Sequence, residues 1–308
     1  MRAKWIMLFA TAVWMPFSIT APAQNLTLEM CLAPQDSDQG SSVEDLLARA
    51  DKAFQDDDDF DETQLCQALR LYERVLESQP DQPHSLNESA QGYFMLGIEY
   101  LSAKEDRAES FRRGLFHGLA RIGVKFPDNL DFLCAVSLPV IQEVQKEGGA
   151  AESDHSLAGL FWAGNDWGKW IDNLSDAERI SRGFNDLPCI QKSFEHSVDV
   201  DETYFAAGPH RALGSFLSQL PGGNLNDAAT HFQRAIELAP DFLENKVDYA
   251  CGVALQLPDR ALFDRLIDDV LAAPVGSVFI FWNKRAQRIA GQLKDQADQL
   301  FGSKQCSL

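Results

Sequence analysis

The sequence has few positive charges for its length. It contains 27 Lys and Arg residues against 46 Asp and Glu residues, which gives a net charge of −19 over 308 residues. Nucleic acid and anionic membranes repel an acidic surface of this size, so we expect neither as a partner. Charge alone leaves both an enzyme and a binding module open.

Sequence motifs of known chemistry are also missing. The chain has no H-E-x-x-H zinc motif, no nucleophile elbow, no phosphate-binding loop and no dinucleotide-binding glycine pattern. It has no C-x-x-C pair, which argues against a zinc ribbon or a thioredoxin-type site. The six histidines are scattered, and we expect His117, His196 and His231 at the surface. The sequence therefore predicts no enzyme, no cofactor and no metal site.

Strand-like patterns are the third absence. No stretch alternates apolar and polar residues between turn signals. Apolar residues recur instead at helical spacing through residues 41–301, and a hydrophobic content of 45% supports a packed core. The pattern predicts an all-α chain of about twelve helices.

The N-terminus carries the features of a secretory signal. Arg2 and Lys4 precede the apolar stretch Trp5–Ile19, and Ala21–Ala23 supplies the small residues that a signal peptidase requires. We therefore expect residues 1–23 to be removed and the mature chain to be a soluble periplasmic protein. An uncleaved anchor is the alternative, although the apolar run is short for a membrane span. No cysteine directly follows the run, so the sequence lacks a lipobox and predicts no stable membrane anchor.

All six cysteines remain in the predicted mature chain. An even number of cysteines in an exported protein favours disulfides. Six cysteines allow fifteen full pairings, among which the sequence does not choose. Cys134 and Cys251 lie in apolar helical patterns, so a buried free thiol is the alternative at each.

Composition divides the mature chain into three parts. Residues 24–40 are polar and rich in turn formers, which predicts an irregular arm, and residues 302–308 form a short tail. The helical domain spans residues 41–301. A charged, glycine-containing stretch at 147–154 marks a possible boundary within this domain, with one continuous array as the alternative.

One stretch, residues 203–243, has the signature of a helix hairpin. A small, aromatic, small pattern that ends at a proline marks its second helix at Ala228, Phe232, Ala235 and Pro240. We expect Ala228 and Ala235 to face the first helix near Gly214, with Gln233 on the opposite side. The same register occurs earlier at Ala68, Tyr72, Val75 and Pro80. The recurrence predicts a tetratricopeptide-like helical repeat array built of antiparallel hairpins.

More specific sequence runs occur within the hairpin and on both sides of it. They are Gly208–Gly214, Leu220–Gly223, Asn245–Val247 and Leu271–Pro274, together with the Trp-rich stretch Leu160–Trp170. These runs resemble the T-component family of tripartite ATP-independent periplasmic (TRAP) transporters, over roughly residues 43–300. The resemblance implies a periplasmic accessory protein that engages the solute-binding component of the transporter and assembles as a homo-oligomer, a trimer in the family. A groove lined by the indoles of the Trp-rich stretch would hold a small apolar ligand. An exported interaction scaffold of the tetratricopeptide type, with no transport role, is the alternative.

Seven residues in these runs are candidates for ligand or partner binding: Trp162, Asn165, Trp167, Trp170, Tyr204, His210 and Arg211. Aromatic residues at helical spacing usually belong to a core. Gly164 and Gly168 lie between the indoles, however, and glycine in a helix marks the close approach of another helix or of a ligand. A buried structural hydrogen bond and a ligand-binding role both remain open for His210.

Overall fold

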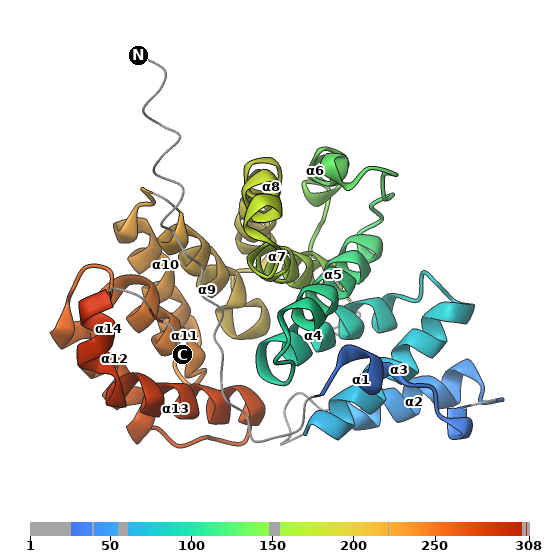
Figure 1. Ribbon diagram of the computed structural model, residues 1–308, viewed down its shortest axis with the longest axis horizontal. Coiled ribbons are helices and arrows are strands. Elements are labelled where there is room, and N and C mark those ends of the chain that lie inside the picture. The colour runs from blue at the N-terminus through green and yellow to red at the C-terminus, as the bar shows by residue number, and fades with distance from the viewer. Residues whose placement is uncertain are drawn as a thin grey trace, which may run out of the picture. The chain divides into compact units, whose positions relative to one another are not determined.

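The computed structural model describes residues 26–38, 40–54, 61–147, 155–220, 222–303 and 306. Within these ranges the protein is all-helical, with fourteen α-helices and no strand (Figure 1). The predicted fold class, a helical repeat array, is confirmed. The predicted signal peptide lies outside the described residues, as does Pro221 in the turn of the predicted hairpin.

The chain forms two compact units. The N-terminal unit contains the described part of Ile19–Tyr204 with Ser277–Phe281, and the C-terminal unit contains Phe205–Gly276 with Trp282–Leu308. The helices on either side of the predicted boundary at 147–154 both belong to the N-terminal unit. The division between the units instead follows Tyr204.

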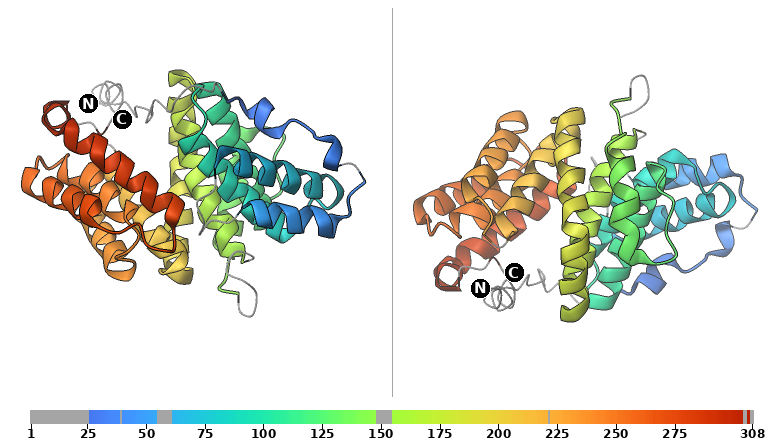
Figure 2. Two further views of the ribbon diagram at one scale, coloured as in Figure 1. Left: turned by 90° about the horizontal axis from the view of Figure 1, so that it is seen from below. Right: turned by 90° about the horizontal axis from the view of Figure 1, so that it is seen from above.

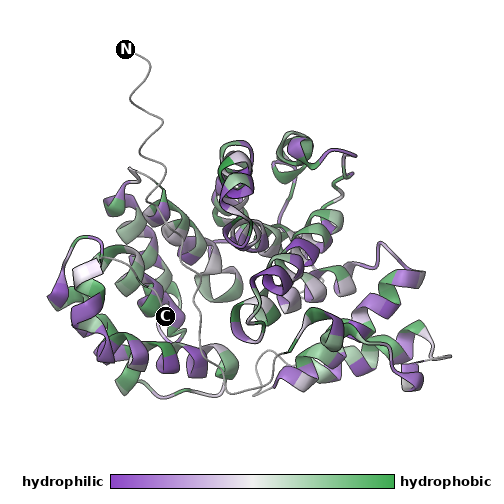
Figure 3. Ribbon diagram, in the orientation of Figure 1, coloured by the Kyte–Doolittle hydropathy of each residue, from purple (hydrophilic) through white to green (hydrophobic). Residues whose placement is uncertain are grey.

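The N-terminal unit stacks its helices as antiparallel pairs. Its elements are α1 (Leu28–Leu32), η1 (Asp36–Asp38), α2 (Val43–Ala53), α3 (Glu62–Ser78), α4 (Pro83–Glu99), α5 (Lys104–Arg121), η2 (Leu130–Phe132), α6 (Leu133–Ile141), α7 (Ser156–Asp172) and α8 (Asp176–Asp201). Helix α2 packs on α3, α4 packs on α5, and α7 contacts α4, α5 and α8 (Figure 2). On α2 and α3, polar and apolar residues occupy different faces, so their apolar faces meet in the interior (Figure 3).

Local sequence explains where several of these helices begin. The Asp61 side chain accepts hydrogen bonds from the backbone at the start of α3 while Gln64 reaches back to Asp61. Ser175 and Glu178 form the same reciprocal arrangement at the start of α8. Such capping boxes satisfy backbone N–H groups that have no partner within the helix.

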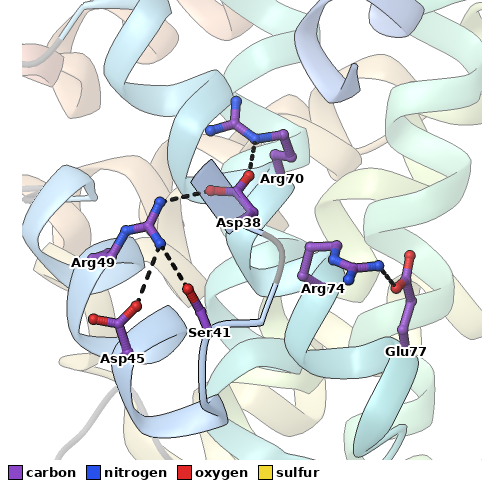
Figure 4. A network of polar contacts seen from close by, with 7 residues as sticks. All are labelled: Asp38, Ser41, Asp45, Arg49, Arg70, Arg74 and Glu77. Atoms are coloured by element: carbon purple, nitrogen blue, oxygen red, sulfur yellow. Dashed lines mark hydrogen bonds and ion pairs between the residues drawn. The ribbon is translucent and has the colours of Figure 1, made fainter. Parts of the chain in front are cut away.

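The predicted irregular arm contains a short helix and is attached to the helical domain. Helix α1 is joined to α3 by a disulfide between Cys31 and Cys66. At the end of η1, the buried Asp38 carboxylate accepts hydrogen bonds from Arg49 Nη2 at 2.6 Å and Arg70 Nε at 2.8 Å (Figure 4). These contacts are tertiary, which is why the polar composition of the arm did not reveal them.

The C-terminal unit contains the predicted hairpin. Its elements are α9 (Tyr204–Gln219), which begins one residue before the unit, α10 (Leu225–Leu238), α11 (Glu244–Tyr249), the π-helical η4 (Ala250–Ala254), α12 (Arg260–Ala272), α13 (Ile280–Asp295) and α14 (Ala297–Ser303). A Cβ atom on Gly214 of α9 would lie 3.2 Å from the carbonyl oxygen of Ala228 in α10. The predicted close approach of the two helices at this point is therefore confirmed.

The start of α9 departs from regular helix geometry, although it lies in the stretch where the hairpin pattern predicts a helix. Phe205, Ala206 and Ala207 have φ angles of 44°, 53° and 59°, in the left-handed region. Contacts with distant residues hold this segment: Asn245 Nδ2 donates to Ala206 O at 3.4 Å, and the Phe205 ring packs edge-on against Phe242 and Trp282. Long-range packing thus overrides a helical sequence pattern.

All six cysteines are paired. The disulfides are Cys31–Cys66, Cys134–Cys189 and Cys251–Cys306. The preference for disulfides is confirmed, and the alternative of buried free thiols at Cys134 and Cys251 is wrong because each lies beside a partner contributed by a distant helix or by the C-terminal tail.

Candidate functional site

The Trp-rich stretch forms α7, in the interior of the N-terminal unit. Its three indoles are buried, with exposed fractions of 1% for Trp162, 0% for Trp167 and 6% for Trp170. The Trp162 ring lies 5.4 Å from that of Phe94 on α4 and 4.9 Å from that of Phe161, measured between centroids. The indoles therefore fill the space between α7 and its neighbours.

Charged groups of α8 secure the other two indoles. Trp167 Nε1 donates a hydrogen bond to Asp186 Oδ2 at 3.1 Å. Arg182 lies 3.5 Å from the same oxygen and stacks over the Trp170 ring at 5.0 Å. Burial raises the pKa of Asp186, while the Trp167 and Arg182 contacts act in the opposite direction. This group of side chains fixes α7 on α8.

Asn165 and Asp166 occupy different environments on the same helix. Asn165 is half-buried, and its Nδ2 donates to Phe161 O in the same helix at 2.8 Å. Asp166 is fully buried, and neither carboxyl oxygen has a hydrogen-bond partner among the described residues. Burial therefore raises the pKa of Asp166 well above its usual range and favours the neutral form of the carboxyl group.

The glycine positions of α7 confirm one prediction. A Cβ atom on Gly164 would lie 2.9 Å from the Phe194 ring of α8, so this glycine allows close helix packing. Apart from the backbone of α7 itself, no atom of the described residues lies within 4 Å of the corresponding point at Gly168. Glycine was predicted to mark the close approach of a helix or of a ligand, and at Gly164 the approaching group is helix α8.

Tyr204 completes the set of candidates in the N-terminal unit. It is buried, and its ring meets Phe161 edge-on with centroids 5.4 Å apart. The structure therefore brings Trp162 and Tyr204 together around Phe161, whereas His210 and Arg211 belong to the other unit.

His210 is buried in the hairpin of the C-terminal unit. Its Nδ1 atom lies 2.8 Å from Nδ1 of His231, so the pair joins α9 to α10. A hydrogen bond between two imidazole nitrogens requires one of them to carry the proton and the other to accept it. His231, which we expected at the surface, is half-buried and paired. The helical register of the hairpin could have predicted this pairing, because His210 on α9 and His231 on α10 both face the contact between the two helices.

Arg211 is also buried, and it takes part in a charged group. Its Nη1 atom lies 3.4 Å from Glu244 Oε2 and 3.5 Å from Asp248 Oδ2, and its guanidinium stacks over the Phe242 ring at 5.1 Å. Arg285 binds the other oxygen of Glu244. The buried Glu244 carboxylate is thus shared by two arginines, as a buried charge requires.

Sequence reasoning assigned no role to Asn245, although it begins one of the characteristic runs. Its Nδ2 donates to the backbone oxygens of Ala235 at 3.1 Å and of Ala206 and Ala239, each at 3.4 Å. This one amide therefore connects α11 with the end of α10 and with the left-handed segment of α9. Asn245 thus holds these segments together in the fold.

One recess lies apart from all of these residues. It has a volume of about 360 Å³ and is lined by Pro34, Gln35, Asp38, Gly40 and Arg74. The described residues contain no group of three or more side chains placed to hold a metal ion. None of the helices within the described ranges is long and apolar enough to span a membrane.

The seven candidate residues thus contact other parts of the protein, and their role in binding stays a prediction. Two comparisons bear on the protein as a whole. No curated protein matches the chain closely enough to count as a relative. A family model described as TRAP transporter T-component matches residues 54–301, which is most of the chain and includes residues of both units. The chain therefore belongs to the TRAP transporter T-component family.

Proposed function

We propose that the protein is an exported accessory component of a TRAP-type solute uptake system and that it engages the solute-binding component. The observation that carries this proposal is the family match over residues 54–301. The three disulfides support it, because such bonds persist in oxidising compartments such as the periplasm. In this role the protein performs no chemistry of its own.

The burial of the candidate residues supports recognition through the surface. The indoles of α7, the His210–His231 pair and the Arg211–Glu244 pair all contact groups within their own unit. Their contacts position helices, so we assign engagement of the partner to exposed helix faces. Assembly of the chain with copies of itself, as a trimer by resemblance to the family, forms part of the same proposal.

Direct binding tests the proposal. The mature chain, with its disulfides formed, is titrated with the purified solute-binding protein of the same uptake system, and heat release is recorded by calorimetry. We expect saturable binding, with no binding to a solute-binding protein from an unrelated uptake system. Absence of a complex between the two folded cognate proteins would contradict the proposal and favour the general interaction scaffold. Sedimentation velocity of the mature chain alone measures its self-association.

A further inference from the structure

Exposed apolar side chains lie on two connected segments of the N-terminal unit, which are η2 with the following α6, and α8. Phe132 at the end of η2 is 60% exposed and Val136 of α6 is 37% exposed, while Ile180 and Phe184 of α8 are 50% and 64% exposed. The other large exposed apolar side chains among the described residues are Met30, Phe126, Leu257, Leu271 and Val278. We call the group of Phe132, Val136, Ile180 and Phe184 the α6–α8 surface.

The two elements that carry this surface are held together firmly. A disulfide joins Cys134 of α6 to Cys189 of α8. Arg182 of α8 donates from Nη1 to Leu130 O at 2.7 Å, and its Nη2 lies 3.6 Å from Asp131 Oδ1. Figures 1 and 2 show α6 beside α8. The disulfide and the Arg182 contacts therefore hold the helices that carry these apolar side chains in a fixed position relative to each other.

The exposure follows from the arrangement of α8. Ile180 and Phe184 are four residues apart, so they share one face of the helix. Arg182 and Asp186 occupy the opposite face, where they contact α7 through Trp170 and Trp167. Because that face holds the helix on its unit, the face with Ile180 and Phe184 points outward.

The centre of the α6–α8 surface lacks exposed charge. Helix α6, from Leu133 to Ile141, contains no charged residue, in a chain in which 24% of residues are charged. Between Ile180 and Gln191 only Arg182 and Asp186 are charged, and they pair with each other on the inner face at 3.5 Å. Depletion of charge together with exposed aromatic side chains is typical of the centre of a protein interface.

Acidic side chains border this uncharged centre. The side chain of Asp131, which precedes Phe132, is 60% exposed, and that of Asp176, at the start of α8, is 87% exposed. Glu178 is exposed as well. Arg179 lies 3.0 Å from Asp176, and the largely buried Arg182 lies 3.6 Å from Asp131, so the three acidic side chains face two arginines and the border keeps a negative excess. A complementary partner presents an apolar patch bordered by basic side chains.

We propose that the α6–α8 surface is the docking site for the solute-binding component, which contacts it through an apolar patch with a Lys- and Arg-rich border. The inference rests on the proposed function. A second copy of this chain fits the surface less well, because a symmetric contact places the same border on both sides and brings acidic groups together. An anionic membrane is repelled by the same border.

Two substitutions test the assignment. Phe184→Asp and Phe132→Asp each place a charge in the centre of the surface, and the exposure of both rings allows the fold to remain intact. Met30→Asp is the control, since Met30 is also 60% exposed in the same unit but lies on α1. Affinity for the purified cognate solute-binding protein is measured by calorimetry, and thermal unfolding verifies the fold of each variant.

We expect the two Phe variants to bind tenfold more weakly or worse, as substitutions at the centre of an interface do, and the Met30 variant to bind like the wild type. Asp176→Lys should weaken binding several-fold and reduce its dependence on salt.

If the wild-type chain binds its cognate partner and both Phe variants bind equally well, the surface assignment is wrong while the proposed function stands. If the Phe variants lose only self-association in sedimentation, the occupant is a second copy and the assignment is overturned. If the wild-type chain fails to bind the cognate protein, the proposed function fails and the surface loses its assigned occupant.

Discussion

The carboxyl group of Asp166 on α7 lies directly against the backbone of Gly114 on α5. A Cβ atom on Gly114 would come within 2.3 Å of Asp166 Oδ2, so the carboxyl group occupies the space of the missing side chain. Asp166 is fully buried, and its oxygens have no hydrogen-bond partner among the described residues. The close contact between α5 and α7 thus includes a buried carboxyl group without a hydrogen-bond partner among the described residues.

Asp166→Asn should change how stability depends on pH. The pKa of Asp166 is raised in the folded state, so the folded chain keeps a proton that the unfolded chain releases. The free energy of unfolding therefore falls as pH rises from the ordinary aspartate value of about 4 towards the raised pKa. The amide cannot ionise, so the variant should gain stability relative to the wild type as pH rises from 4 to 8.

Urea unfolding between pH 4 and pH 8 measures this effect, with Asp128→Asn as the control because Asp128 is exposed. The control should follow the wild-type pH profile. A constant stability difference between Asp166→Asn and the wild type across the whole range would show that Asp166 ionises normally in the folded protein.

Gly114→Ala should destabilise the protein even though alanine favours helices. The new methyl group would collide with the Asp166 carboxyl group, and overpacking of this kind costs about 1–3 kcal/mol. Gly168→Ala on α7 is the matched control, since, apart from the backbone of α7 itself, no atom of the described residues lies within 4 Å of its Cβ position. Helix propensity alone should stabilise that variant by up to about 1 kcal/mol. Thermal unfolding of the two variants should therefore shift in opposite directions, and shifts of the same sign would contradict the packing described here.

Ala206→Gly should stabilise the left-handed segment before α9. Ala206 has φ 53° and ψ 47°, a conformation that costs an L-residue with a Cβ atom roughly 1–2 kcal/mol. Glycine adopts it freely but loses more chain entropy on folding, so the expected net gain is up to about 1 kcal/mol. Ala261→Gly, at an exposed position in α12, should instead lose about 1 kcal/mol. Denaturant midpoints distinguish the two, and a loss of stability at both positions would argue for a helical backbone at residue 206.

The sequence predicted those features of the fold that depend on helical periodicity. The small and aromatic residues of the hairpin recur at the spacing of one helix face, so the approach of Gly214 to Ala228 followed from the pattern alone. Contacts between distant segments left no periodic signal. The pairing of Cys134 with Cys189 and the anchoring of Asp38 by Arg49 and Arg70 are of this kind.

The candidate site shows the same division. The identity of Trp167 indicated either core or ligand contact, and only the position of Asp186 shows that the indole N–H has a partner within the protein. His210 was singled out through its neighbours in sequence, whereas its partner His231 was placed at the surface because its helical face is mixed. Exposure of Ile180 and Phe184 also required the structure, since apolar residues four apart on a helix usually face a core.

Ala235→Leu tests the packing of the hairpin by adding bulk at a fully buried position. Ala235 is completely buried in α10, and its carbonyl oxygen accepts a hydrogen bond from Asn245, so the helix cannot shift without loss of that contact. We expect a loss of about 1–3 kcal/mol in the free energy of unfolding.

The control for this variant is Ala261→Leu, which makes the same chemical change at an exposed position of α12. Its stability should stay within about 0.5 kcal/mol of the wild type. Gln233 is exposed, as predicted, but its Nε2 donates to Tyr249 Oη at 3.0 Å, so a substitution there would also remove a hydrogen bond. Urea unfolding of both leucine variants with disulfides intact gives the comparison. Equal midpoints would mean that Ala235 does not face the interior of the hairpin, and the repeat register of residues 203–243 would lose its support.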